Sequence, residues 1–342
     1  MNDHGKYTAI EIIKFMCVAV MIFVHAHIVL ITDGYAISDT SGFFYRITSD
    51  LMFLCLFIMI LPILAGIVYG INKNFDIKKT LKSGLFLVLL GFLMNAFTWS
   101  IFYIFSWNIL QFIALSFFVL AILIKFFSTK FIFLVGLLSI IIAEPLRNIL
   151  SDLSNNYLIG IFIGADNHYM FWPFFPWFGL VAFGFVFIRI YEKYKNEYMF
   201  NLLSGVLGLI LILPAIIKNE ISPFLDPVYI WGPSLFQPQT LLVVAALGAF
   251  LCLITISNFL FKDIELSKYG IINSYSKGIL WIYVIQMFVS FKLSFVIKEY
   301  FSMEGPSLAY FILPIFMLIF SWIIGALGIK LFTERIVIKI KK

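Results

Sequence analysis

The feature that most constrains this chain is a succession of apolar runs, each about as long as a membrane is thick. A helix needs about 20 mostly apolar residues to cross a bilayer, and ten such runs are present: 8–31, 51–71, 82–104, 108–127, 129–146, 171–190, 200–217, 239–261, 271–297 and 307–331. The fifth is the weakest, because Glu144-Pro145 interrupts its end and a re-entrant piece over 157–164 would alter the count. No gap between the runs is long enough for a soluble domain. We therefore predict an all-α, polytopic integral membrane protein with about ten transmembrane helices, forming a single domain over 1–342.

The composition narrows the class of protein further. Apolar residues make up 62% of the 342 residues and charged residues only 12%, against about 25% charged residues in an average globular protein. A soluble fold of this size could not bury so much apolar surface, so the lipid bilayer is the expected solvent. A disordered chain, a nucleic-acid-binding protein and a soluble enzyme are excluded on this ground.

The placement of basic residues predicts the orientation in the membrane. Cytoplasmic loops carry an excess of Lys and Arg, and with ten spans both termini share one side. That side holds 17 of the 24 Lys and Arg residues, whereas the opposite side holds four: Arg46, Arg147, Lys218 and Lys298. Both termini are therefore predicted to be cytoplasmic.

Three ionisable side chains fall on one stripe of the first apolar run, in EIIKFMCVAVMIFVHAH. Ionisable groups inside a span are costly and are functional candidates by default. Glu11 and Lys14 are three residues apart and so share a helix face. Lys14 and His25 are eleven residues apart, which leaves them about 20° from full register and about 16 Å apart along the axis. His27 points about 160° away from Lys14.

Two interpretations of this stripe are open. In the first, Glu11 and Lys14 form an ion pair near the interface, and His25 bonds a neighbouring helix. In the second, the stripe is catalytic, because imidazole is the natural proton acceptor near neutral pH. A metal site is not expected, since the chain has only four His residues and His25 and His27 lie on different helix faces.

A second group of candidates is expected near the outer surface, at a depth similar to that of His25. Asp166, His168, Trp172 and Trp177 lie where the sixth run begins, and Gln111 opens the fourth. The segment WPFFPW is typical of an interfacial aromatic belt. Its two prolines in four residues also indicate an irregular helix start, which in lipid is tolerated only against protein or water. His168 can equally be a solvated loop residue, and Gln111 can orient a substrate or simply bond a neighbouring helix.

Three further polar side chains have mainly structural interpretations. Asn95 and Gln286 are amides in the middle of spans, where bonding between helices is the favoured role. Glu144 lies near the outer end of the fifth run. It can orient His25, but a boundary charge is the favoured interpretation.

Five segments carry a resemblance to a known group of enzymes, in addition to the acidic-x-x-basic pair that precedes His25 by ten residues. They are FLCLFIMILPILAGIVYG (53–70), KKTLKSGLFLVLLGFLMNAF (78–97), NILQFIALSFFVLA (108–121), WPFFPWFGLVAFG (172–184) and YSKGILWIYVIQ (275–286). In this order they resemble motifs of the polytopic membrane acyltransferases, most of all the bacterial relatives of heparan-α-glucosaminide N-acetyltransferase, which are related to the acyltransferase type 3 family. Lys14 stands where those relatives usually have Arg. The loop 32–50 lacks the His that a relative uses in catalysis, which moves the catalytic prediction to His25.

The resemblance implies an acyl-CoA-dependent O- or N-acyltransferase of the bacterial inner membrane. Its donor would be acyl-CoA, with acetyl-CoA expected, and its acceptor an extracytoplasmic glycan or lipid-linked sugar. His25 would be the general base, or would carry the acyl group itself, with Glu11 holding Lys14. Four lysines would attract CoA: Lys14, Lys277, Lys78 and Lys79. Five residues would contact the acceptor: Gln111, Asp166, His168, Trp172 and Trp177.

Other interpretations remain open at this point. The basic loop that contains Lys78 and Lys79 is also explained by the inside excess of positive charge alone. A transporter or flippase of a glycan or lipid-linked sugar is the alternative function, although such proteins often show inverted repeats and none is visible here. A structural or sensory membrane protein, in which the stripe only holds helices together, is a further alternative. The oligomeric state is not fixed by the sequence, and a homodimer is possible.

Overall fold

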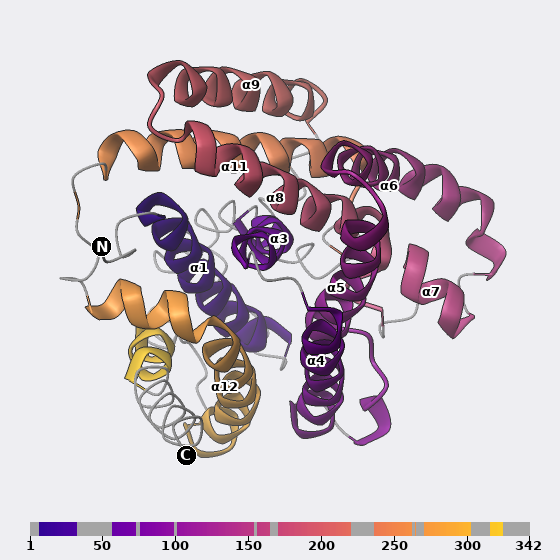
Figure 1. Cartoon of the computed structure of the whole chain (residues 1–342). Helices are drawn as coiled ribbons and strands as arrows, with labels where there is room; N and C mark the ends of the chain where they lie inside the picture. The colour runs from indigo at the N-terminus through magenta and orange to yellow at the C-terminus, as the bar shows by residue number, and fades with distance from the viewer. Residues whose placement is uncertain are drawn as a thin grey trace, which may run out of the picture. The chain divides into compact units, whose positions relative to one another are not determined.

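The part of the chain that the computed structural model describes is almost entirely helical (Figure 1). It comprises residues 7–32, 57–72, 76–98, 101–153, 156–164, 170–219, 236–261, 264, 270–301 and 315–323. Seven helices within it are long and apolar enough to cross a membrane, and two shorter apolar helices cover Phe57–Ile71 and Gly278–Val289. The chain is therefore an all-α, multi-pass membrane protein, as predicted.

The helices follow the predicted apolar runs closely. They are α1 (Thr8–Thr32), α3 (Leu61–Ile71), α4 (Ile77–Thr98), α5 (Ile109–Phe126), α6 (Thr129–Ile149), α7 (Tyr157–Ile163), α8 (Phe174–Tyr194), α9 (Tyr198–Ile217), α11 (Thr240–Leu260) and α12 (Gly270–Phe301). The start of the second predicted span and most of the tenth lie outside the described residues, apart from a helical segment at 315–323. A short helix, α7, occupies the region where a re-entrant piece was considered.

Several helices extend beyond the runs that hydropathy indicates, among them α4 and α6. Helix α4 begins five residues before the predicted start, because Asp76 caps it: its carboxylate accepts a hydrogen bond from the Lys78 backbone N–H at 2.9 Å. Such a cap satisfies an N–H group that has no partner within the helix. The first turns of α4 thereby include Lys78 and Lys79. Helix α6 continues through Pro145 and ends at Ile149 rather than at 146.

The chain groups into two compact units, one formed by 1–58, 225–228 and 253–342, the other by 59–224 and 229–252. The single domain predicted over 1–342 stays a prediction. In the first unit, α1 packs against α12 (Figure 1). The Phe15 ring meets the Tyr275 ring edge-on at 5.2 Å, and the Tyr275 hydroxyl donates to the Leu318 carbonyl.

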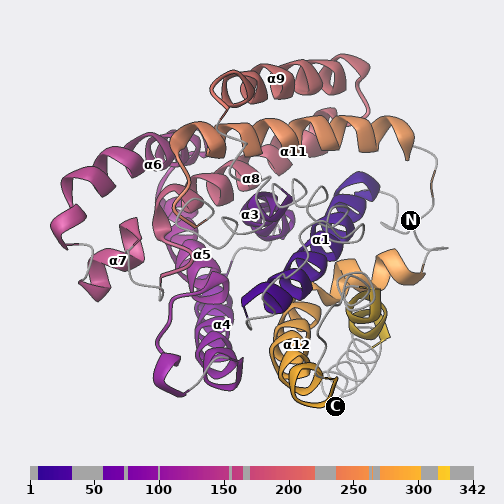
Figure 2. The ribbon, with the colours of Figure 1, turned by 180° about the vertical axis from the view of Figure 1, so that it is seen from behind.

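The second unit is built around α8, against which both α3 and α6 pack. The contact with α3 is very close: a Cβ atom on Gly184 would lie 2.0 Å from the Ile63 carbonyl oxygen, and one on Gly66 would lie 2.0 Å from that of Val181. Small residues let helix backbones approach in this way in membrane proteins. Opposite views show α4 beside α5 and α9 along α11 (Figures 1 and 2).

Candidate functional site

His25 of α1 is bound to Gln286 of α12, a residue 261 positions away in the sequence. The His25 Nδ1 atom lies 2.8 Å from the Gln286 Nε2 atom and 3.2 Å from its Oε1 atom. Gln286 is fully buried, whereas His25 is half-buried. The amide expected to join helices therefore does so, and its partner is the candidate catalytic histidine.

The amide can serve either tautomer of the imidazole. In the shorter contact, Gln286 Nε2 donates to an unprotonated Nδ1. With the amide turned over, a protonated Nδ1 donates to Oε1 and leaves Nε2 as the basic nitrogen. Gln286 can therefore orient His25 as a base without adding a charge of its own.

The pair inferred from the spacing of Glu11 and Lys14 is present on the first two turns of α1. The Lys14 Nζ atom lies 2.8 Å from a Glu11 carboxylate oxygen. Lys14 is only 7% exposed, and this ion pair offsets part of the cost of burying its charge. Because α1 runs unbroken from Thr8 to Thr32, Glu11, Lys14 and His25 stand on one continuous helix, as the stripe requires.

Two of the tryptophans assigned to acceptor binding are packed into the second unit. Trp172 is 6% exposed and Trp177 is completely buried, and their rings lie 4.6 Å apart. The Trp177 indole N–H donates to the Phe236 carbonyl at 2.9 Å, and that of Trp107 donates to the Trp172 carbonyl at 2.8 Å. The described contacts give both tryptophans a role in packing, and their contact with an acceptor stays a prediction.

The start of α8 is irregular, as its prolines predicted. Phe175 has non-helical angles, with φ −93° and ψ 132°, and the Phe175-Pro176 peptide bond is cis. Of the residues expected beside this helix start, Asp166 and His168 lie outside the described residues.

Gln111 belongs to a buried amide network at the start of α5. Asn108 is the N-cap, and its side chain accepts from the Leu110 N–H at 2.9 Å, while the Gln111 side chain accepts from the Asn108 N–H at 3.3 Å. The Asn108 amide donates to Asn95 of α4 at 2.6 Å. Gln111 thus has the partners that its structural interpretation requires, and its contact with a substrate stays a prediction.

Glu144 also has a partner that suits its structural interpretation. Its carboxylate accepts from the Thr240 N–H at the start of α11, at 3.4 Å. One turn later, Arg147 donates to the carbonyls of Ile163 and Gln237, at 3.2 and 2.8 Å. These contacts join the end of α6 to its neighbours in the second unit.

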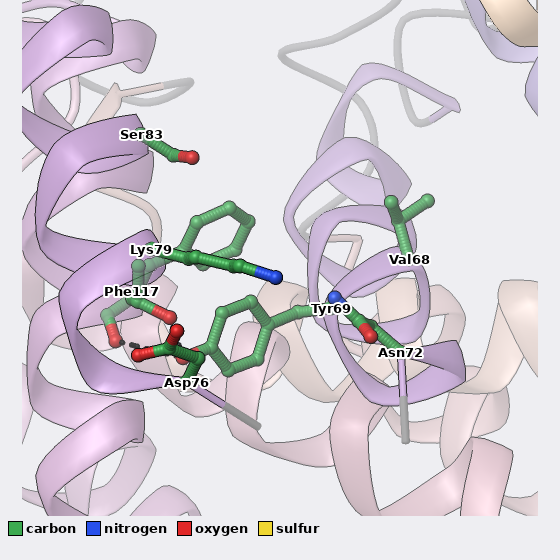
Figure 3. Close-up of a pocket in the computed structure, with 8 residues that line it drawn as sticks. Val68, Tyr69, Asn72, Asp76, Lys79, Ser83 and Phe117 are labelled. Atoms are coloured by element: carbon green, nitrogen blue, oxygen red, sulfur yellow. Dashed lines mark hydrogen bonds between the residues drawn. The ribbon is translucent and has the colours of Figure 1, made fainter. Parts of the chain in front are cut away.

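The lysines assigned to CoA differ in what surrounds them. Lys277 lies on α12, but its side chain is not among those described. Lys78 and Lys79 are both exposed on α4, and only Lys79 lines a cavity of about 210 Å³ (Figure 3). Its other lining residues are Val68, Tyr69, Asn72, Asp76, Thr80, Ser83 and Phe117. In the described ranges, no three His, Cys, Asp or Glu side chains converge to hold a metal ion.

Sequence reasoning did not connect Gln286 with His25 and did not find this cavity. Gln286 closes the segment YSKGILWIYVIQ, so its place in a motif was visible, but a partner on another helix was not. Asn108 and Gln111 have the spacing of a capping box, a signal that would have shown the structural role of Gln111.

A family model described as heparan-alpha-glucosaminide N-acetyltransferase, catalytic, matches residues 6–214, more than half of the chain. The match includes Glu11, Lys14 and His25, and four of the five segments that carried the resemblance. It ends within α9, so Lys277 and Gln286 lie beyond it. The comparisons with curated proteins and with solved structures found no match.

Proposed function

The chain belongs to the heparan-alpha-glucosaminide N-acetyltransferase catalytic family, and on this basis we propose which donor, acceptor and residues this membrane acetyltransferase uses. Its donor is cytoplasmic acyl-CoA, with acetyl-CoA the expected form. Its acceptor is a glycan or lipid-linked sugar on the other side of a bacterial inner membrane. The orientation follows from the excess of Lys and Arg on the side of the termini.

The observation that carries this proposal is the bond between His25 and Gln286. An imidazole in a membrane-spanning helix is costly and is a functional candidate, and here a second helix supplies an amide oxygen, Gln286 Oε1, 3.2 Å from the Nδ1 atom, to which a protonated Nδ1 can donate. A fixed ring orientation is what a general base needs before the substrate arrives. The proton transfer then uses the other ring nitrogen, Nε2.

The reaction balances as a simple acyl transfer. The hydroxyl or amine of the acceptor attacks the thioester carbonyl carbon, and His25 takes the proton that the attacking atom loses. The C–S bond breaks, a C–O or C–N bond forms, and the leaving thiolate of CoA recovers the proton from His25. In the covalent variant, His25 first accepts the acyl group and then passes it to the acceptor.

The remaining assignments divide between the two substrates. Lys14, Lys277, Lys78 and Lys79 are proposed to attract the phosphates of CoA, because they lie on the side predicted to be cytoplasmic or near the ends of helices that face it. Asp166, His168, Trp172, Trp177 and Gln111 are proposed to receive the acceptor. Glu11, 2.8 Å from Lys14, is proposed to hold that lysine in place.

The experiment is to incubate the purified protein in nanodiscs with labelled acetyl-CoA, and to compare the wild type with His25→Ala. We expect both proteins to bind the donor. With no acceptor present, the wild type should slowly release free CoA as water takes the acetyl group, and the variant should release it roughly 10² to 10⁴ times more slowly. His27→Ala is the matched control, since it removes a histidine from the other face of the same helix and should release CoA normally.

Two results would contradict the proposal. If neither protein binds acetyl-CoA while both remain folded, the donor is wrong, and vesicle flux assays for a transported glycan become the next step. If His25→Ala releases CoA as fast as the wild type, the donor stands and the base does not. Thermal unfolding of all three proteins separates a catalytic defect from a folding defect.

A further inference from the structure

The cavity beside Lys79 has the mixed chemistry of a nucleotide site. We propose that it binds the nucleotide end of acyl-CoA, the adenosine 3′,5′-bisphosphate group, and that Lys79 is its phosphate contact. This rests on the proposed function, which names acyl-CoA as the donor but leaves open where the long molecule is held.

The walls of the cavity offer one partner for each part of a nucleotide. Tyr69 of α3 and Phe117 of α5 stack on each other with ring centroids 4.5 Å apart, forming an aromatic wall suited to a base. Lys79 reaches from α4 into the space between α4 and α3 (Figure 3). Asn72 and Ser83 add an amide and a hydroxyl from opposite sides, which suit the hydroxyls and oxygens of a ribose phosphate.

Lys79 differs from its neighbours by position and not by charge. Lys78, Lys79 and Lys82 all lie on the first turns of α4 and are exposed, but Lys79 alone of the three lines the cavity. In the described part of the chain, no carboxylate forms an ion pair with it. Asp76, the acidic residue in the lining, accepts a hydrogen bond from the Lys78 N–H at 2.9 Å and so serves as the cap of α4.

The size of the cavity indicates a subsite for one end of a larger ligand. Its volume is about 210 Å³, whereas pockets that enclose a whole drug-sized ligand measure about 300–1,000 Å³. CoA is long, with its bulky charged nucleotide at one end and its thiol at the other. A small, open cavity that holds only the nucleotide leaves the pantetheine arm free to extend beyond it.

The side of the membrane agrees with this ligand. The cavity lies at the end of α3 and the start of α4, in the connection that the distribution of Lys and Arg places in the cytoplasm, where CoA is found. A lysine that lines the cavity, with two more on the same turns of α4, favours a phosphate-bearing ligand over a neutral one.

The test measures the affinity of the full-length protein in nanodiscs for labelled acetyl-CoA and its displacement by adenosine 3′,5′-bisphosphate. The variants are Lys79→Gln and Lys82→Gln, the second being a control that removes the same charge from the same helix outside the cavity. We expect Lys79→Gln to weaken the binding of both ligands about tenfold, the loss of one charge-assisted contact, and Lys82→Gln to change it less than twofold. Dephospho-CoA, which lacks the 3′-phosphate, should bind the wild type more weakly than CoA.

A second variant tests the space rather than the charge. Ser83→Trp would fill the cavity from α4, and it should abolish displacement by the bisphosphate without removing any positive charge. Thermal unfolding shows whether each variant is folded before its affinity is compared.

The outcomes separate this inference from the function on which it rests. Equal losses for Lys79→Gln and Lys82→Gln would mean general attraction by the basic loop and would overturn the subsite. Failure of the bisphosphate to displace bound acetyl-CoA would overturn it too, while the acyltransferase proposal would stand. Displacement that depends on Lys79, in a protein that never releases CoA from acetyl-CoA, would support the subsite and overturn the proposed reaction.

Discussion

The two compact units satisfy their buried polar side chains in different ways. In the first unit, the candidate catalytic side chains bond other side chains, His25 to Gln286 and Lys14 to Glu11, while Tyr275 donates to the Leu318 carbonyl. In the second, Trp177 and Arg147 donate to backbone carbonyls, and Asn95 bonds both the Ser106 carbonyl and the Asn108 side chain. A bond to the backbone fixes a scaffold, whereas a bond between two side chains can change its partner or its proton. On the proposed function, we therefore expect the first unit to carry the acyl transfer and the second to supply the framework.

The largest effect on catalysis among these predictions is expected from a change at Gln286, the partner of His25. Gln286→Met keeps the length of the side chain but removes both polar atoms, so the His25 ring loses its orientation. We expect kcat for CoA release to fall about 10²-fold. The KM for acetyl-CoA should be unchanged, because the lysines proposed to bind the donor are left intact. Steady-state kinetics of the purified variant, beside its thermal unfolding, make the measurement.

A double variant shows whether Gln286 acts through His25. His25→Ala combined with Gln286→Met should be no slower than His25→Ala alone, since coupled residues are not additive. If Gln286→Met has a normal kcat, or if only its KM for acetyl-CoA rises, Gln286 does not orient His25. Its role would then be limited to holding α1 and α12 together.

The framework role of the second unit predicts a loss of stability without a loss of chemistry. Gly184→Ala would place a Cβ atom 2.0 Å from the Ile63 carbonyl oxygen, which forces the backbones of α3 and α8 apart. We expect the free energy of unfolding to fall by about 1–3 kcal/mol or more, measured by unfolding in detergent. The folded fraction should keep its activity.

Gly84→Ala is the matched control for this clash. Its Cβ atom would lie 2.2 Å from the end of the Phe118 ring, a side chain that can turn aside. Alanine is also the better helix former by about 1 kcal/mol, so this change should be nearly neutral. Equal destabilisation by the two substitutions would show that backbone contact between α3 and α8 is not what holds the unit together.

A modest loss in the free energy of unfolding is expected when the Asn95 amide is removed. Its amide donates to the Ser106 carbonyl at 2.6 Å and accepts from the Asn108 amide at 2.6 Å. Asn95→Leu should destabilise the protein by about 1–2 kcal/mol, the range found for hydrogen bonds between helices in membranes. In the described residues, the buried Thr98 hydroxyl one turn later has no partner, so Thr98→Val should change the unfolding midpoint very little. A larger loss at Thr98 than at Asn95 would contradict the scaffold role of the amide.

Features that depend on one stretch of sequence were predictable. The spans follow from apolar length, the Glu11–Lys14 pair from a spacing of three on a helix, and the irregular start of α8 from its two prolines. The start of α4 was set five residues too late, because hydropathy favours Leu85 and its neighbours over the polar cap at Asp76.

Features that depend on pairing between distant helices were not predictable in the same way. Periodicity places His25 and Gln286 on their own helices, but it does not say which helices meet. Aromatic residues at a predicted membrane surface look alike in sequence whether they bind an acceptor or form an interfacial belt, the two interpretations open for Trp172 and Trp177. They look the same when they are buried against one another, as the structure places these two.

The amide at position 286 also bears on how the protein is assembled in the membrane. If a carboxylate held His25 in place of the amide, its helix would enter the lipid with an acidic side chain near its centre. A residue such as Asp at that position raises the free energy of inserting the helix by about 2.5–3.5 kcal/mol. Gln286, near the middle of α12, brings no charge. Helices α1 and α12 are far apart in the sequence, so each can enter the bilayer before the other is present and join it afterwards. Neither helix then has to carry an acidic partner for His25 through the lipid alone.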